Sequence, residues 1–324
     1  MRKPPAVVRP RFCTQSRASS TSPLTTANKK NRVRMTTPVL ETQSTKKATT
    51  PRLIAKVREQ GYLNFIEWAP ADDGHLESVH IAEFRHPQFG ACEAFAKLYK
   101  GGTGHGIVNE ITGWLCAHAM GVPQPEFAFV ANIPLARLRS PTGWVAQEKR
   151  RGAATLPAFC TKRLDGKSAA IRMPNSEIPA LLDDVRAWKD VARATALDEH
   201  IAHTDRHLNN LIRLGRRQYA VIDNGRLASD TTASWSAGTL DSGRLYWNRL
   251  SERLWNNSPD DATVSCILDA AANHAGAFEN VRDELHYWWE LLLPTREYQD
   301  FSSFLERRTD IIEALLRKRY HRLA

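Results

Sequence analysis

His203-Thr-Asp205-Arg206-His207-Leu-Asn209-Asn210 and, a few residues later, Tyr219-Ala-Val-Ile-Asp223-Asn224-Gly225 are the runs that decide how this sequence folds. The segments 211–214 and 219–222 have the composition of two short strands, and the residues between them predict a turn. With a four-residue turn at 215–218, Leu214 is expected opposite Tyr219. Counting back along both strands then puts Asn210 opposite Asp223.

This hairpin predicts a metal site. Directly opposed residues have Cβ atoms about 4.5–5.5 Å apart, so an amide oxygen from Asn210 and a carboxylate from Asp223 would lie side by side. Hard cations such as Mg²⁺ bind oxygen ligands, commonly one or two carboxylates completed by phosphates and water. We therefore expect a magnesium ion that holds a nucleotide, with Asp205 near enough to orient and deprotonate an attacking hydroxyl.

The motif pair Asp205-Arg-His-x-x-Asn210 and Ile222-Asp-Asn-Gly225 resembles that of the HipA-like kinases. These enzymes share a kinase-like fold with phosphatidylinositol kinases and aminoglycoside phosphotransferases. The resemblance implies that Asp205 is the catalytic base and that Asn210 and Asp223 bind the metal ion. It covers roughly residues 53–230, and residues 159–166 are similar to the hinge that joins the two lobes in the family.

The resemblance also implies a strand lysine that reaches the nucleotide phosphates and a helix glutamate that holds this lysine. Lys97, in Ala-Phe-Ala-Lys-Leu-Tyr, and Glu110, in Ile-Val-Asn-Glu, have the required order and context. Both are therefore expected at the ATP site.

The remaining pattern predicts a β-rich half followed by a helical half. Strands are expected at 52–57, 63–68, 79–84, 94–99 and 126–130, and a helix at 107–120 that Gly121 and Pro123 end. Further helices are expected from 179 to 192 running into 195–202, and at 262–273, 277–293 and 301–323. We expect an α+β, bilobal, protein-kinase-like fold, with a small β-rich N-lobe at 52–165 and a larger, mostly helical C-lobe at 166–324 that carries the catalytic and metal-binding loops.

The composition is that of a soluble globular protein. With 42% hydrophobic and 25% charged residues in 324, the chain is not wholly disordered, collagen-like or a disulfide scaffold. It has no apolar stretch near the roughly 20 residues that a membrane helix needs. Five cysteines, an odd number without a Cys-x-x-Cys pair, predict reduced thiols and a cytoplasmic location.

The positive charge of the chain is concentrated at its start. Residues 1–52 contain twelve Lys or Arg and a single acid, Glu41, whereas the rest is close to neutral. A basic Ser/Thr-rich segment without apolar periodicity predicts a disordered tail at 1–51. A nucleic-acid-binding arm and an organelle transit peptide remain alternatives for this tail, and nucleic acid is not expected to bind elsewhere.

The three histidines of the central segment, His200, His203 and His207, lack the His-Glu-x-x-His order of a zinc site. We expect His203 and His207 to brace the catalytic loop through hydrogen bonds. The tryptophans are expected in the core rather than as platforms for bases, namely Trp235, Trp247, Trp255, Trp288 and Trp289.

These observations predict an ATP- and Mg²⁺-dependent kinase. By resemblance, the acceptor is a Ser or Thr of a protein substrate, and an antitoxin is a possible partner. A small-molecule kinase is one alternative, because His203-x-Asp205-x-x-x-x-Asn210 also fits the aminoglycoside phosphotransferase pattern. A catalytically inert, kinase-shaped interaction module is another, because no Gly-x-Gly-x-x-Gly precedes Lys97.

Overall fold

The computed structural model describes residues 52–69, 77–100, 104–230 and 234–321. The tail predicted at 1–51 lies outside these ranges, as does the segment 70–76 that connects the second and third strands.

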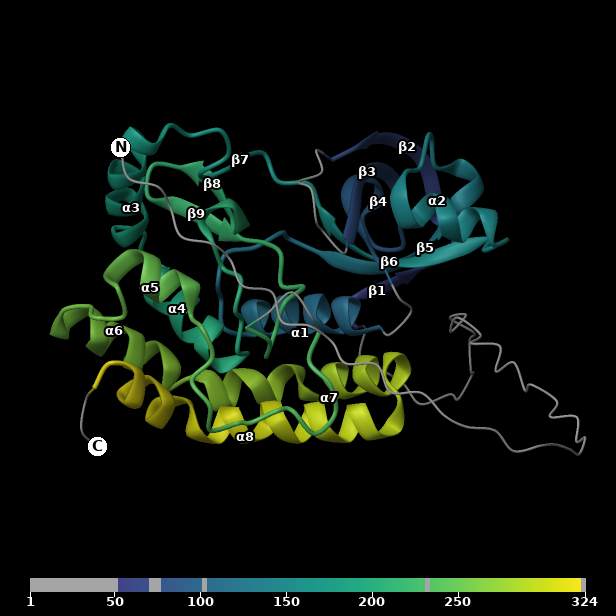
Figure 1. Cartoon of the computed structure of the whole chain (residues 1–324). Helices are drawn as coiled ribbons and strands as arrows, with labels where there is room; N and C mark the ends of the chain where they lie inside the picture. Colours follow the sequence, from purple (N-terminus) through teal and green to yellow (C-terminus); the bar gives the residue numbers. More distant parts are fainter. Residues whose placement is uncertain (1–51, 70–76, 101–103, 231–233, 322–324) are drawn as a thin grey trace, which may run out of the picture. The chain divides into compact units, whose positions relative to one another are not determined.

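A six-stranded sheet is formed by the first half of the described chain (Figure 1). Its strands are β1 (Ala55–Val57), β2 (Tyr62–Trp68), β3 (Glu77–His86), β4 (Gly90–Tyr99), β5 (Ala128–Pro134) and β6 (Thr155–Lys162), in the order β1-β5-β6-β4-β3-β2. β1 is parallel to β5, and the other neighbouring pairs are antiparallel.

Alternation along β4 separates a core face from a site face. Ala94, Ala96 and Leu98 are buried in the main apolar core, together with Val145 of helix α2 (Gly143–Arg150). Because successive side chains of a strand point to opposite faces, Lys97 and Tyr99 lie on the other face of the sheet. This face positions the lysine of the candidate site.

The second half of the described chain is mostly helical (Figure 1). A small antiparallel sheet of β7 (Lys167–Ser168), β8 (Leu211–Gly215) and β9 (Gln218–Val221) is accompanied by α3 (Ile178–Arg186), α4 (Val191–His200), α5 (Arg249–Trp255), α6 (Asp261–Ala271), α7 (His274–Leu292) and α8 (Thr295–Arg319). Short 3₁₀ helices occupy Glu59–Gly61, Leu135–Arg137, Asn175–Glu177 and Leu208–Asn210. The predicted α+β class, with helices concentrated towards the C-terminus, is confirmed at this level.

Helix α1 (His105–Ala119) connects the two halves. It packs on α7 and also contacts β6 and α4, and most of its residues are buried. A helix that is buried on most sides belongs to a core rather than to a surface. It ends as predicted: Gly121 has φ +66°, and the N–H of Val122 donates to Ala117 O at 2.9 Å.

Two expectations are wrong in detail. The helix expected from residue 179 to 192 ends at Arg186, and the non-helical residues 187–190 separate it from α4. Trp247 is not a core residue, since 39% of it is exposed, whereas Trp235, Trp288 and Trp289 are buried as predicted. Of residues 159–166, which resemble the family's hinge, the first four belong to β6, and 163–166 connect β6 of the large sheet to β7 of the small one.

No helix in the described ranges combines the length and the apolar character needed to cross a membrane. Cys92, Cys116, Cys160 and Cys266 are free thiols, and Cys13 lies outside the described residues.

A buried histidine in β3 has no hydrogen-bond partner in the described ranges. His80 packs among Tyr62, Phe65 and Trp68, with a ring centroid 5.7 Å from that of Phe65 and stacked on it. Neither ring nitrogen has a hydrogen-bond partner among the described residues. Burial lowers the pKa of His80 from 6.5 to about 4.

We expect acid to destabilise the protein partly through His80. Because the folded pKa lies below the unfolded one, the unfolded state binds more protons between these values, and stability falls as the pH drops below about 6.5. The contribution of His80 at pH 5 is about 2 kcal/mol. Denaturant unfolding at pH 7.5 and pH 5 should show that His80→Phe loses about that much less stability than the wild type. The exposed His118 is the control, and an equal effect of His118→Phe would contradict the assignment.

Candidate active site

Lys97 of β4 is the centre of a partly buried ion-pair cluster, in which the side chains of Lys97 and Asp223 are 15% and 31% exposed. Its Nζ lies 2.7 Å from Glu110 Oε1 and 2.7 Å from Asp223 Oδ1. Glu110 belongs to α1, which packs close to the sheet face that carries Lys97, and Asp223 follows β9. Three of the residues expected at the site are therefore in direct contact.

Glu110 connects this cluster to the rest of the site. Its Oε1 also accepts a hydrogen bond from Tyr99 Oη at 2.8 Å, and its Oε2 accepts the backbone N–H of Asn224 at 2.9 Å. Glu110 is only 2% exposed, and its burial raises the pKa of the carboxyl group against the opposing effect of Lys97. The side chain thus holds together a strand, a helix and the loop after β9.

Lys97 forms ion pairs with two carboxylates. Burial alone lowers the pKa of Lys97, but Asp223 and Glu110 together raise it well above its usual value. Burial opposes ionisation of Asp223, but Lys97 holds the pKa of Asp223 well below its usual range. With both carboxylates ionised, the cluster has one more negative than positive charge, which a metal cation would offset.

The predicted hairpin is present, but its register differs by one residue. Arg213, not Leu214, lies opposite Tyr219, because the turn contains two residues rather than four and the register shifts at Leu214. Two-residue turns match the twist of antiparallel strands better than most longer loops. The prediction that Asn210 and Asp223 are directly opposed is therefore wrong. The carbonyl oxygen of Asn210 instead accepts the N–H of Ile222 at 3.0 Å.

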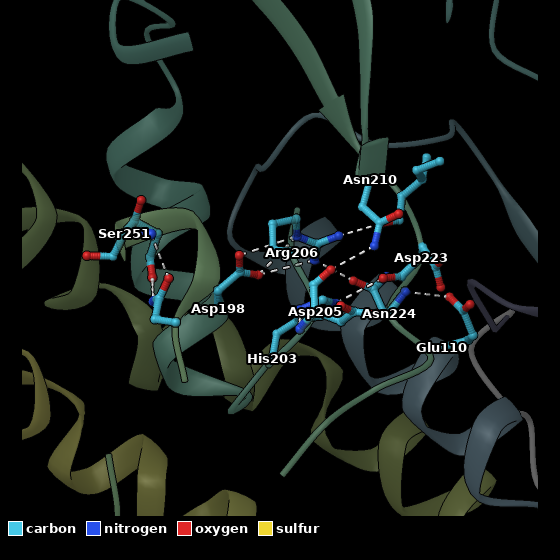
Figure 2. Close-up of polar contacts among 12 residues, drawn as sticks. Glu110, Asp198, His203, Asp205, Arg206, Asn210, Asp223, Asn224 and Ser251 are labelled. Atoms are coloured by element: carbon cyan, nitrogen blue, oxygen red, sulfur yellow. Dashed lines mark hydrogen bonds and ion pairs between the residues drawn. The ribbon is translucent and has the colours of Figure 1, made fainter. Parts of the chain in front are cut away.

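Asp223 reaches Lys97 through an unusual backbone conformation. Its φ is +62°, in the left-handed region that Asp and Asn enter more readily than other non-glycine residues. Because β9 ends at Val221, two residues before Asp223, and Asp223 has this conformation, strand counting cannot place the side chain. The close-up in Figure 2 shows Asp223 next to Glu110, in the same cluster as Asp205 and Asn210.

Asn210 lies in the 3₁₀ helix Leu208–Asn210 rather than in a strand. Its Nδ2 donates to the backbone oxygen of Asp205 at 2.8 Å, so the amide nitrogen is used inside the loop and the amide oxygen faces away from that carbonyl. The side chain is 5% exposed. Asn210 therefore has both a fixed orientation and an oxygen suited to a cation.

His203 joins the two acidic loops. Its Nε2–H donates to the backbone oxygen of Asp223 at 2.9 Å, and its Nδ1 accepts the backbone N–H of Asp205 at 3.2 Å. Burial lowers the pKa of His203 well below its usual value, which keeps the ring neutral as this pattern requires. The prediction that His203 braces the loop is confirmed. His207 braces the loop through its backbone N–H, 2.8 Å from Asp205 O, whereas its buried Nδ1 has no hydrogen-bond partner in the described ranges.

Arg206 is a part of the site that the sequence analysis missed. This fully buried side chain donates to Asp198 Oδ1 of α4 at 3.1 Å, to Asn224 Oδ1 at 2.7 Å and to the backbone oxygen of Ile222 (Figure 2). Burial raises the pKa of Asp198 to about 6, although Arg206 acts in the opposite direction. The only signal in the sequence was the position of Arg206 directly after Asp205. Its partners Asp198, Ile222 and Asn224 are 8 to 18 residues away along the chain.

A glycine lets α1 approach the loop after β9. A Cβ atom on Gly113 would lie 2.3 Å from the Cβ and Cγ of Asn224, which is far too close. Gly113 is about one helical turn from Glu110, so the same face of α1 supplies the carboxylate and admits the loop.

The carboxylate of Asp205 is held by two arginines. Its Oδ1 contacts Arg249 Nη1, and its Oδ2 lies 3.0 Å from Arg226 Nη1. Asp205 is thus close to the other predicted residues through His203 and Asn210, but both of its oxygens already have cationic partners. Neither arginine was anticipated from the sequence.

The residues fit a hard divalent cation. Asp223 offers a carboxylate, Asn210 offers an amide oxygen, and two carboxylates share the single ammonium group of Lys97. His200, by contrast, points elsewhere and bonds to Thr309 Oγ1 at 2.7 Å. The described residues contain no cluster of three or more His, Cys, Asp or Glu that is arranged to hold a metal.

No family model matches this chain, and no curated protein matches it significantly. The resemblance to HipA-like kinases therefore rests on the motifs at 205–225 and on Lys97 and Glu110.

Proposed function

We propose that this protein is an ATP- and Mg²⁺-dependent phosphotransferase of the HipA-like type, with a bilobal kinase-like fold and a serine or threonine hydroxyl as acceptor. The observation that carries the proposal is the contact of Lys97 with both Glu110 and Asp223 at 2.7 Å. A strand lysine paired with a helix glutamate, next to a loop aspartate, is the arrangement by which kinases hold nucleotide phosphates.

Each side chain has a role in this proposal. Lys97 binds phosphate oxygens of ATP, and Glu110 keeps its ammonium group in place. Asp223 and Asn210 hold Mg²⁺, which supplies positive charge to the phosphates.

Asp205 acts on the acceptor. Its carboxylate orients the hydroxyl and takes its proton while the hydroxyl oxygen bonds to the γ-phosphorus of ATP. The bond between that phosphorus and the oxygen that bridges to the β-phosphate breaks, and ADP leaves. His203 fixes the backbones of Asp205 and Asp223 relative to each other, and such positioning accounts for much of the rate enhancement in phosphoryl transfer.

A catalytically inert, kinase-shaped interaction module is the second candidate. It is favoured by the pairing of both Asp205 oxygens with Arg226 and Arg249, which leaves the carboxylate engaged before any acceptor arrives. Such a module would bind nucleotide without turning it over.

Thermal stabilisation by ATP with and without Mg²⁺ tests the nucleotide site. A ligand at 100 times its Kd adds about 2.7 kcal/mol to stability. The wild type and Lys100→Met, which changes an exposed lysine of the same segment, should be stabilised by Mg-ATP, and Lys97→Met should not. The absence of any nucleotide effect on folded wild-type protein would contradict both candidates. If Mg-ATP does stabilise the protein, radiolabel transfer from ATP separates an active enzyme from an inert module.

A further inference from the structure

Arg226 and Arg249 are placed where an acceptor would have to approach Asp205. Each uses Nη1 to contact one oxygen of the Asp205 carboxylate. A guanidinium group has five N–H donors, and about a third of each arginine side chain is exposed, 35% and 33%. Both arginines therefore retain donors for a molecule that enters from solvent.

The backbone of each arginine is fixed by the fold. The carbonyl oxygen of Arg226 accepts the N–H of Thr204, in the short antiparallel pairing that precedes Asp205. Arg249 follows the buried Asn248, whose Oδ1 accepts the N–H of Ser251 at 3.0 Å and whose Nδ2 donates to Thr195 O at 3.1 Å. The two cations are thus presented by well-anchored segments from different parts of the chain.

Two acidic residues close in sequence to Arg226 and Arg249 have partners of their own. Asp230 pairs with Arg244, and Glu252 accepts the indole N–H of Trp247 at 2.5 Å. The exposed ring of Trp247 lies under Arg249, with 4.4 Å between the guanidinium carbon and the ring centroid. At Asp205, two positive charges meet one negative charge.

We propose that Arg226 and Arg249 form an anion-binding subsite for the phosphoacceptor. The acceptor is then an alcohol that carries a carboxylate or phosphate group a few atoms from its hydroxyl. This inference rests on the proposed phosphotransferase function. A hydroxyl within hydrogen-bond reach of Asp205 brings its neighbouring groups close to both guanidinium groups, and an anionic neighbour forms charge-assisted hydrogen bonds with them. Those bonds replace the contacts that the arginines lose when Asp205 turns to the hydroxyl.

Matched acceptors test the preference on the full-length protein with Mg-ATP. One arm uses three peptides with a single serine flanked by Glu, Gln or Lys, and the other compares glycerol 3-phosphate with glycerol. We expect the anionic member to exceed its neutral counterpart by about 10- to 100-fold in kcat/KM, as charge-assisted hydrogen bonds require, and the arm that shows transfer identifies the source of the acceptor. Equal rates for anionic and neutral acceptors would overturn the inference while leaving the kinase proposal intact.

Arginine variants separate a role in acceptor binding from a structural role. Arg226→Gln and Arg249→Gln should raise KM for the anionic acceptor and change KM for the neutral one little. Arg244→Gln removes a neighbouring arginine and should leave the preference unchanged. An equal fall in kcat for all acceptors would overturn the inference, because the arginines would then serve the transferred phosphate.

A binding measurement keeps the test independent of turnover. In Asp205→Asn the two arginines lose their carboxylate partner, so the variant should bind the Glu-flanked peptide at least about 10-fold more tightly than the Gln-flanked one, measured by fluorescence anisotropy. Equal affinities would overturn the anion subsite. Tighter binding of the Glu-flanked peptide by this variant, together with no transfer to any acceptor by the wild type, would support the subsite and contradict the phosphotransferase proposal.

Discussion

Asp205→Asn is expected to lower phosphoryl transfer by about 10²–10⁴-fold, the range that a general base contributes, while Mg-ATP still stabilises the protein. Asparagine has nearly the same size, and its oxygen can still accept a hydrogen bond from Arg226 or Arg249. It cannot take the proton of the acceptor hydroxyl. Initial rates of radiolabel transfer, together with thermal stabilisation by Mg-ATP, measure the two effects separately.

Asp230→Asn is the matched control for this variant. It also removes a carboxylate that pairs with an arginine, Arg244, but Asp230 accepts the backbone N–H of Trp247 rather than contacting the Lys97 cluster or Asp205. Its transfer rate should remain within a few-fold of the wild type. If Asp205→Asn retained the wild-type rate, Asp205 would not be the base, and the proposed mechanism would fail.

Arg206→Met is expected to reduce the free energy of unfolding by about 3–5 kcal/mol, because it leaves the buried carboxylate of Asp198 without its cation. It also removes the donors to Asn224 and Ile222, so the loop that carries Asp223 should loosen and Mg-ATP binding should weaken. Arg206→Lys should recover little, since an ammonium group cannot reproduce the planar set of donors. Urea unfolding at neutral pH measures the loss of stability, and thermal stabilisation by Mg-ATP measures the weaker binding.

A double variant and a surface control make the interpretation specific. Asp198→Asn combined with Arg206→Met should lose less stability than Arg206→Met alone, because no uncompensated charge remains buried. Arg213→Met breaks the pair with Asp184, in which nearly half of the arginine side chain is exposed, and should cost less than about 1 kcal/mol. Equal losses for Arg206→Met and Arg213→Met would show that burial of the Arg206 network contributes nothing special.

Much of the fold could be predicted from the sequence because local pattern determines it. The strands around Lys97, the end of α1 at Gly121 and the hairpin after Asn210 each follow from alternation, turn residues or capping. The residues expected at the site are brought together, although their roles stay predictions.

What could not be predicted depends on contacts between distant segments or on single turns. The hairpin has a two-residue turn instead of the expected four-residue one, which shifts its register by one residue. The side chain of Asp223 is positioned by its positive φ and not by strand pairing. Arg206, Arg226 and Arg249 were missed because their partners are defined by packing between α4, α5 and the loops. An arginine gives no local signal of whether it will be buried.

The left-handed backbone at Asp223 also bears on how this chain could change over generations. Asparagine tolerates that conformation about as well as aspartate does, whereas longer or branched residues do not. A single exchange of one oxygen for nitrogen would therefore remove the charge there at little conformational cost. Under the proposed function, a relative with the same fold but without phosphotransferase activity is therefore a single substitution away.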